Sequence, residues 1–202
     1  MSKNIADIRK DYQMQSLLET DVSGDPFEQF SKWWADAEKS ELDEINAMTL
    51  ATASKTGIPA ARIVLLKSVT ETGFVFFTNY NSAKGRELEE NPHACLVFFW
   101  KELERQIRIS GKVEKISTAE SDAYFNSRPE GSRIGAWASP QSRIIASREI
   151  IENNIAEYMQ QFADGNIARP PHWGGYIVVP TVIEFWQGRT NRLHDRIQYT
   201  KL

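Results

Sequence analysis

A run near the C-terminal end, Ile183–Arg196, concentrates side chains that can do chemistry. It holds the indole of Trp186, the guanidinium of Arg192 and the imidazole of His194. An arginine plane can stack on a flat ring or neutralise developing negative charge, and a histidine can transfer protons near neutral pH. If Leu193 lies in the middle of a strand, Arg192 and His194 share one face of it. The alternative is a surface strand that carries an Asp–Arg pair.

Two earlier segments place cations beside regular structure. Arg62 and Lys67 bracket four apolar residues in an expected strand, where alternation points them to opposite faces and therefore to different anions. The segment Thr78–Lys84 runs from a strand end into a helix start, where free N–H groups favour phosphate. Taken alone, each segment is better explained by structure, as surface cations at strand ends and as a capped helix.

A fourth segment, Tyr124–Ser132, falls where a helix is expected to give way to a loop. Tyr124, Arg128 and Ser132 would make a plausible phosphate clamp, because arginine and hydroxyl donors suit phosphate oxygens. The equally good alternative is a helix C-terminus with a favourable cation, followed by a turn.

Composition limits the classes of protein that remain. The 202 residues carry a net charge of −3, which argues against a general nucleic-acid binder. Cys95 is the single cysteine, so a reducing cytoplasmic setting fits, and no run is apolar enough to span a membrane. The three histidines show no metal-ligand spacing, so no metal site is predicted. There is also no glycine-rich phosphate loop, so side chains must hold any anionic cofactor.

The elements that must position these residues follow from periodicity and turn signals. A helix is expected over 26–39, because Asp25 can cap it and Pro26 suits its first turn. Strands are expected over 47–53, 61–69, 74–79, 93–100, 105–116, 176–186 and 193–200, and helices over 82–91, 118–127 and 142–162. The segment 128–139 carries Pro129, Gly131 and Gly135 and is expected to be loop. This order predicts a mainly β (α+β) domain over 26–202, an antiparallel barrel with flanking helices, preceded by a flexible N-terminal arm over 1–25.

The run E-F-W-Q-x4-R-L-H-D-R, from Glu184 to Arg196, resembles the signature of the pyridoxine/pyridoxamine 5'-phosphate oxidase family. The other three segments resemble that family's motifs in the same order, so chance agreement is a poor explanation. The resemblance implies an FMN-binding split β-barrel of antiparallel Greek-key type and a homodimer with its active sites at the subunit interface. It also implies oxidation of pyridoxine 5'-phosphate or pyridoxamine 5'-phosphate to pyridoxal 5'-phosphate, with O2 reduced to hydrogen peroxide.

The resemblance also implies a role for each matching residue. The implied FMN contacts are Arg62, Ile63, Val64, Leu65, Leu66, Lys67, Phe77, Thr78, Lys84, Gln106, Gln141, Ser142, Trp186 and Arg196. The implied substrate contacts are Arg9, Lys10, Asp11, Tyr12, Lys67, Tyr124, Arg128, Ser132, Arg192, Leu193 and His194, of which Arg192 and His194 are the implied catalytic residues. One departure matters for the cofactor: Ala83 stands where the family usually has an arginine, which predicts weaker FMN binding.

Three alternatives remain open. A related flavin oxidase could act on another ring substrate, such as a phenazine precursor, but Tyr124, Arg128 and Ser132 would then have no phosphate to bind. A non-catalytic flavin-binding protein would not need Arg192 and His194. A single-strand nucleic-acid barrel could stack bases on Phe74, Phe76 and Phe77, but the acidic balance disfavours it.

Overall fold

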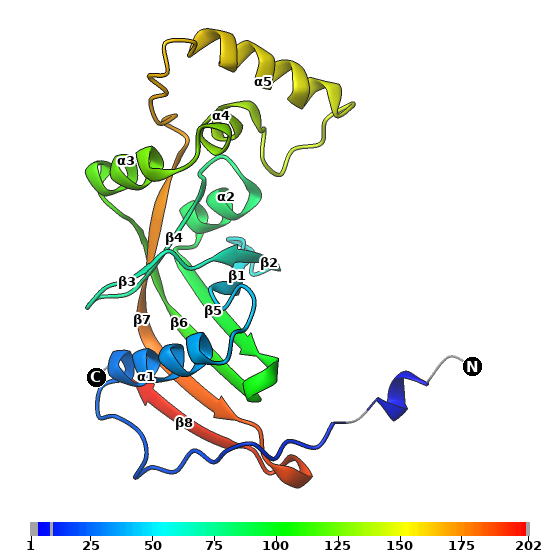
Figure 1. Ribbon diagram of the computed structural model, residues 1–202, viewed down its shortest axis with the longest axis vertical. Coiled ribbons are helices and arrows are strands. Elements are labelled where there is room, and N and C mark those ends of the chain that lie inside the picture. Colours follow the sequence, from blue (N-terminus) through cyan, green and yellow to red (C-terminus); the bar gives the residue numbers. More distant parts are fainter. Residues whose placement is uncertain (1–3, 9, 201–202) are drawn as a thin grey trace.

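The computed structural model describes residues 4–8 and 10–200 and shows one antiparallel sheet surrounded by helices (Figure 1). Its strands are β1 (Ala47–Ala53), β2 (Pro59–Leu65), β3 (Ser68–Val69), β4 (Phe74–Asn79), β5 (His93–Trp100), β6 (Arg105–Lys115), β7 (Trp173–Gln187) and β8 (Asp195–Thr200). Its α-helices are α1 (Pro26–Lys39), α2 (Ala83–Glu90), α3 (Thr118–Ser127), α4 (Glu130–Ala138) and α5 (Glu149–Gln161). Three short 3-10 turns complete it: η1 (Ile5–Asp7), η2 (Lys101–Leu103) and η3 (Thr190–Arg192).

The sheet order is β2-β1-β5-β6-β7-β4-β3, and β8 pairs with the remaining free part of β7. The chain closes this sheet toward a barrel just after β2. Leu66 N–H still donates to Asn46 beside β1, whereas Lys67 N–H donates to Val75 on β4, at 2.8 and 2.9 Å. These two bonds bring the edges of the sheet together, so the predicted mainly β split-barrel architecture is confirmed.

The barrel interior is filled by the inward-facing residues, which alternate with outward-facing residues along the strands. Phe74, Phe76, Phe98 and Phe185 are fully buried there, and Phe30 of α1 packs on Phe74 with ring centroids 5.0 Å apart. Helix α1 starts where the sequence predicts, because Asp25 accepts the N–H of Phe27 at 2.7 Å and Pro26 opens the first turn. This helix therefore covers one open side of the barrel with its apolar face.

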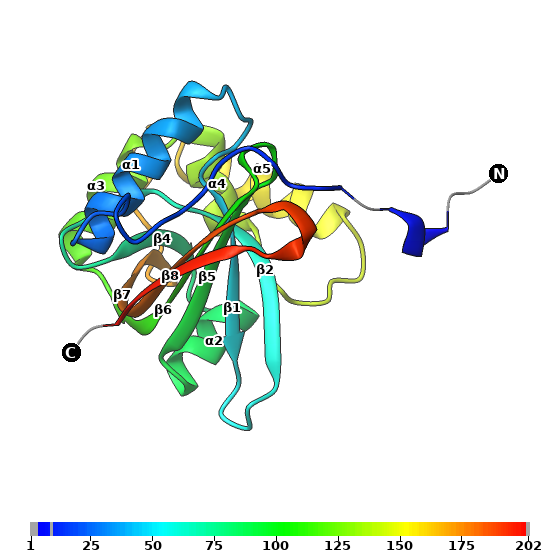
Figure 2. The same cartoon turned by 90° about the horizontal axis from the view of Figure 1, so that it is seen from below.

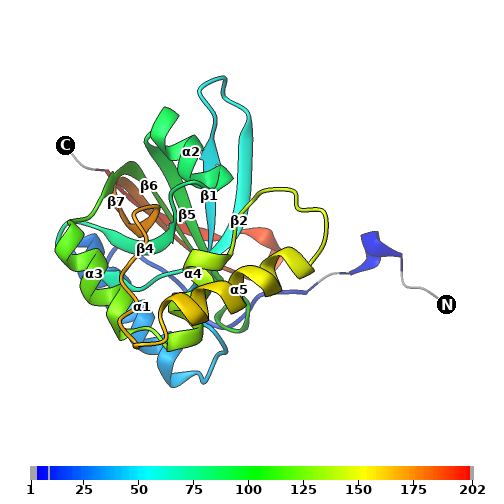
Figure 3. The same cartoon turned by 90° about the horizontal axis from the view of Figure 1, so that it is seen from above.

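Helices α2, α3, α4 and α5 gather toward one end of the sheet, and the β7–β8 hairpin lies toward the other (Figures 1 and 3). A second core ties α3, α4 and the start of β7 together through Phe125, Ile134 and Trp173. Helix α5 packs its Tyr158 and Phe162 on Trp137 of α4, with ring centroids 5.5 and 5.4 Å apart.

Two expectations at this end are wrong. Residues 130–138 form α4 rather than loop, because Gly131 and Gly135 leave the helix intact and Ile134, Ala136 and Ala138 bury one face of it. The helix expected over 142–162 begins only at Glu149, and residues 142–148 are irregular, with Ser142 in a left-handed conformation. A third expectation, in the sheet, is also wrong: the strand expected over 61–69 is divided into β2 and β3 where the chain crosses from β1 to β4.

Candidate active site

A cavity of about 520 Å³ opens where β2, β4, α3 and α4 meet. We call it the cationic pocket, because Lys67, Lys84 and Arg128 line it while none of the described residues lining it is acidic. The other residues around it are Ile63, Val64, Leu65, Phe77, Thr78, Tyr124, Pro129, Ser132, Gln141 and Trp173. Segments that are far apart in the sequence thus form one cavity that attracts anions.

Arg128 lies at the junction between α3 and α4. Its guanidinium stacks over the ring of Trp173, 4.6 Å from the ring centroid, and burial lowers its pKa from the usual value. Its Nη1 is buried without a hydrogen-bond partner among the described residues. Leaving a buried charged donor unsatisfied costs free energy, so this atom is arranged to receive an acceptor from a ligand. An anion is the acceptor that fits, because Ser132 lies in the first turn of α4, whose N-terminus adds a favourable dipole.

Phe77, Tyr124 and Trp173 form an aromatic stack that holds this clamp in place. The rings of Phe77 and Tyr124 lie 3.9 Å apart, and those of Phe77 and Trp173 lie 5.4 Å apart. The stack fixes Tyr124 relative to Arg128 on the next turn of chain. Trp173 was not among the predicted site residues, and its position before Gly174-Gly175 was the signal that could have pointed to it.

Lys84 lies at the start of α2, whose N-cap is Ser82. Its Nζ donates to Gln141 Oε1 at 3.0 Å, and the Thr78 hydroxyl donates to the same oxygen at 3.1 Å. The pKa of Lys84 is lowered first by burial and then by the charge of Arg62, while Glu87 acts in the opposite direction. A bound anion would restore the charge balance around this lysine.

A second group of predicted residues lies around the β7–β8 hairpin. Gln106, Trp186 and Arg196 are partners in register across β6, β7 and β8, so they form one row on the outer face of the sheet. The Arg196 guanidinium donates to Glu184 at 2.8 Å. Trp186 also packs against the ring of His194, at 4.7 Å between centroids. We give the name hairpin cluster to the predicted residues Tyr12, Gln106, Trp186, Arg192, His194 and Arg196.

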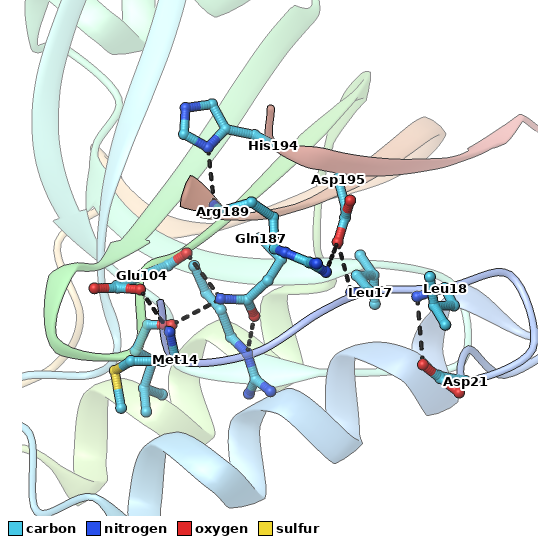
Figure 4. Close-up of polar contacts among 11 residues, drawn as sticks. Met14, Leu17, Leu18, Asp21, Glu104, Gln187, Arg189, His194 and Asp195 are labelled. Atoms are coloured by element: carbon cyan, nitrogen blue, oxygen red, sulfur yellow. Dashed lines mark hydrogen bonds and ion pairs between the residues drawn. The ribbon is translucent and has the colours of Figure 1, made fainter. Parts of the chain in front are cut away.

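Within the hairpin cluster, His194 Nδ1 accepts the backbone N–H of Arg189 at 3.0 Å (Figure 4). In the neutral imidazole the proton is then on Nε2. The strand expected over 193–200 begins only at Asp195, and Arg192 ends the turn η3 with a left-handed φ of 61°, so the condition for a shared strand face is not met. Arg192 and His194 are therefore presented by a tight turn rather than by one strand face.

The N-terminal arm brings three more predicted residues to this end. Tyr12 lies 5.8 Å from the ring of Trp186 and 5.9 Å from that of His194. Lys10 and Asp11 line a cavity of about 410 Å³ together with Asn191 and Arg192. Leu193 is exposed beside it.

Three of the predicted residues that the structure describes join neither group. Arg62 forms an ion pair with Glu87 at 2.9 Å and also bonds Thr52, so its role at the cofactor stays a prediction. Leu66 is buried in the barrel, and Ser142 is exposed in the turn after Gln141. Arg9 lies outside the described residues.

The two groups stand far apart in one chain. Trp173 touches the cationic pocket at one end of β7, and Trp186 lies thirteen residues further along the same strand. At the usual rise of a β-strand this is roughly 40 Å along the strand. One copy of the chain therefore does not bring all the predicted contacts to one small ligand.

Fold and site together define a split-barrel protein with a built anion pocket. The family model described as pyridoxamine 5'-phosphate oxidase matches residues 35–162, and the model described as pyridoxine 5'-phosphate oxidase C-terminal dimerisation region matches residues 173–202. The chain belongs to the pyridoxine/pyridoxamine 5'-phosphate oxidase family.

Individual relatives agree with this assignment. The chain is 58% identical over 202 residues to the pyridoxine/pyridoxamine 5'-phosphate oxidase of Trichormus variabilis, covering 100% of this chain and 94% of that one. It is 61% identical over 197 residues to the protein of the same name from Thermosynechococcus vestitus, covering 98% and 93%.

Two solved structures resemble the chain over most of its length. PhzG from Burkholderia lata, in complex with tetrahydrophenazine-1-carboxylic acid, is 31% identical, covers 94% of both chains and has a TM-score of 0.87. A pyridoxamine 5'-phosphate oxidase-related, FMN binding protein from Nostoc punctiforme is 18% identical and covers 90% of this chain and 94% of that one. Its TM-score of 0.68 supports the fold alone. Among the described residues, no helix is both long enough and apolar enough to cross a membrane.

Proposed function

We propose that this chain is an FMN-dependent oxidase that converts pyridoxine 5'-phosphate or pyridoxamine 5'-phosphate to pyridoxal 5'-phosphate and reduces O2 to hydrogen peroxide. The observation that carries the proposal is the cationic pocket, in which the buried Nη1 of Arg128 has no partner among the described residues. A substrate phosphate would satisfy that donor, with Lys67, Tyr124 and Ser132 completing the clamp. The names of the relatives point to the same substrates.

The residues on the other side of the pocket fit FMN. Strand β2 ends the sheet order, so its outward backbone groups at Ile63–Leu65 are available to a flat polar ring. Lys84, Thr78 and Gln141 would hold the cofactor phosphate near the start of α2. FMN would supply the acceptor for the hydride removed from the substrate, and the protein would supply orientation and charge.

A second copy of the chain would complete the site. The C-terminal dimerisation region covers β7 and β8, which carry most of the hairpin cluster. In a two-fold dimer, the hairpin cluster of one subunit can approach the cationic pocket of its partner, and the reverse contact follows by symmetry. Trp186 and Arg196 would then meet the flavin held by the other subunit, as would Gln106.

Arg192 and His194 would act on the substrate ring from that second subunit. Arg192 is an exposed cation on a rigid turn and would balance negative charge near the ring. His194 is held by the hydrogen bond that it accepts from the Arg189 N–H and by packing on Trp186. Its Nε2–H would therefore donate a hydrogen bond to one defined position on the substrate. Both groups orient the substrate and stabilise charge.

The test is to purify the protein, record its visible spectrum and add pyridoxine 5'-phosphate in air. The proposal predicts a yellow protein that forms aldehyde and peroxide in equal amounts, and little turnover of pyridoxine, which lacks the phosphate. A protein that cannot be reconstituted with FMN contradicts the proposal. Turnover of a reduced phenazine carboxylate, the kind of ligand that PhzG binds in its solved structure, but not of the B6 phosphate would favour the alternative of an oxidase for phenazine precursors.

A further inference from the structure

Glu104 is a charged residue buried at the end of the β5–β6 turn. It is 2% exposed and adopts a left-handed conformation with a φ of 55°. Carboxylates are rarely buried unless several donors satisfy them, and the left-handed region is uncommon for residues other than glycine. Both features indicate that the surrounding contacts specify this side chain.

Those contacts come from the N-terminal arm. Glu104 Oε2 accepts the backbone N–H groups of Gln13 and Met14, at 2.8 and 3.1 Å. Figure 4 shows the bond to Met14. Its Oε1 lies 3.4 Å from Lys10 Nζ. The backbone carbonyl of Glu104 accepts the N–H of Gly188 at 2.7 Å, which fixes the residue to the end of β7. One residue thus joins the arm to the strand that carries Trp186.

The arm is held where its side chains reach the hairpin cluster. Tyr12 packs against Trp186 and His194, and it lies so close to Gly188 that an added Cβ would come within 2.6 Å of its ring. Lys10 and Arg192 line one cavity. The arm runs along the hairpin and continues to Leu17, whose N–H donates to Asp195 Oδ2 at 2.9 Å (Figures 2 and 4).

We propose that Glu104 is a positioning residue: its carboxylate anchors the arm so that Tyr12 stands beside Trp186 and His194, and Lys10 stands beside Arg192. Three carboxylates hold the arm: Asp195 accepts from Leu17 further along, Asp11 of the arm itself accepts the N–H of Asn191 at 3.2 Å, and Glu104 accepts from the two residues that follow Tyr12. The effect of this anchoring on substrate binding rests on the proposed function, whereas the anchoring itself does not.

Hydrogen exchange of the full-length protein without substrate tests the anchoring. Glu104→Ala removes both bonds to Oε2, so the amides of Gln13 and Met14 are expected to exchange about tenfold faster. Glu104→Gln keeps an oxygen for these amides and loses only the charge opposite Lys10, so most of the protection remains. Glu102→Gln is the matched control, because Glu102 is exposed in the same turn, and wild-type exchange is expected. Unchanged exchange at Gln13 and Met14 in Glu104→Ala overturns the anchoring.

Steady-state kinetics of the FMN-loaded enzyme test the positioning. Glu104→Ala is expected to raise KM for pyridoxine 5'-phosphate about tenfold with little change in kcat, because the arm contributes binding. Gln13→Pro removes one of the same bonds from the arm side without touching the barrel, and it should also raise KM. The free-energy change calculated from KM should be smaller in the double variant than the sum of the two single-variant changes, since both substitutions break the same contact. Faster exchange with unchanged KM overturns the positioning role, whereas a wild-type protein without turnover overturns the proposed function and leaves the exchange result standing.

Discussion

Arg128 shows how a single residue can define a ligand class. It is held on three sides, by the ring of Trp173, by the end of α3 and by the start of α4, yet one buried nitrogen has no partner among the described residues. A purely structural arginine would use its donors within the protein. The residue therefore gains most from an anion that enters the cationic pocket.

Replacing Arg128 should separate substrate binding from cofactor binding. Arg128→Ala removes a charge-assisted hydrogen bond, so KM for pyridoxine 5'-phosphate should rise roughly 10- to 100-fold while the Kd for FMN changes little. Arg148→Ala is the control, because Arg148 is exposed and pairs with Glu152 on α5. An equal loss of FMN and substrate affinity in Arg128→Ala would refute this division of roles.

In the proposed cofactor site, Lys84 should make FMN binding sensitive to alkaline pH. Its pKa in the free protein is lowered from 10.5, chiefly by burial, and a bound phosphate favours its charged form. The affinity for FMN should therefore fall as pH rises through that lowered pKa, while the affinity for riboflavin stays nearly constant. Fluorescence titrations of both ligands from neutral pH to about pH 10 measure this difference.

The matched variants for this titration are Lys84→Met and Lys112→Met. Lys84→Met should weaken FMN binding and flatten its pH dependence, since the titrating group is gone. Lys112 is exposed and pairs with Glu114, so its replacement should leave the curve unchanged. A pH dependence that survives in Lys84→Met would assign it to another group.

At the scale of elements, the sequence predicts regular structure well where local signals agree. The helix at 26–39 and the strands at 47–53 and 74–79 have the predicted bounds, because a cap, a proline or a clear turn marks their ends. Helix α4 is missed because Pro129, Gly131 and Gly135 are locally unfavourable, while its stability comes from packing Ile134 and Trp137 against α3 and α5. Local propensity does not report such tertiary contacts.

Two glycines test this distinction between local and tertiary effects. Gly111 lies at the irregularity of β6, where an added Cβ would come within 2.0 Å of the Val179 carbonyl oxygen. Gly111→Ala should therefore destabilise the fold by more than about 2 kcal/mol. Gly135 has open space around it within α4, so Gly135→Ala should stabilise the fold by about 1 kcal/mol.

Thermal or denaturant unfolding of the two glycine variants measures both changes. Opposite shifts of Tm are expected, downward for Gly111→Ala and upward for Gly135→Ala. Equal shifts would contradict the contrast between a crowded bulge and an open helix face.

At the scale of the whole molecule, the outer face of the sheet exposes large apolar side chains. Ile63 and Phe99 are 65% and 52% exposed on neighbouring parts of this face, and Phe99 pairs with Gln106 in the row that leads to Trp186. In the proposed dimer, a second copy of the chain would cover these side chains and complete the divided site. The sequence predicts which residue types form the site. It does not show that β7 separates them into two groups, because the distance between the groups depends on the three-dimensional fold.

The most direct test of the divided site is a heterodimer of Arg128→Ala and Arg192→Ala subunits, purified through two different affinity tags. At a substrate concentration near the wild-type KM, each single variant should have little activity as a homodimer. In the heterodimer, the intact cationic pocket of the Arg192→Ala subunit meets the intact hairpin cluster of the Arg128→Ala subunit, so one of two sites is complete and about half of wild-type activity should return. A heterodimer as inactive as the two homodimeric variants would contradict a site that is divided between subunits.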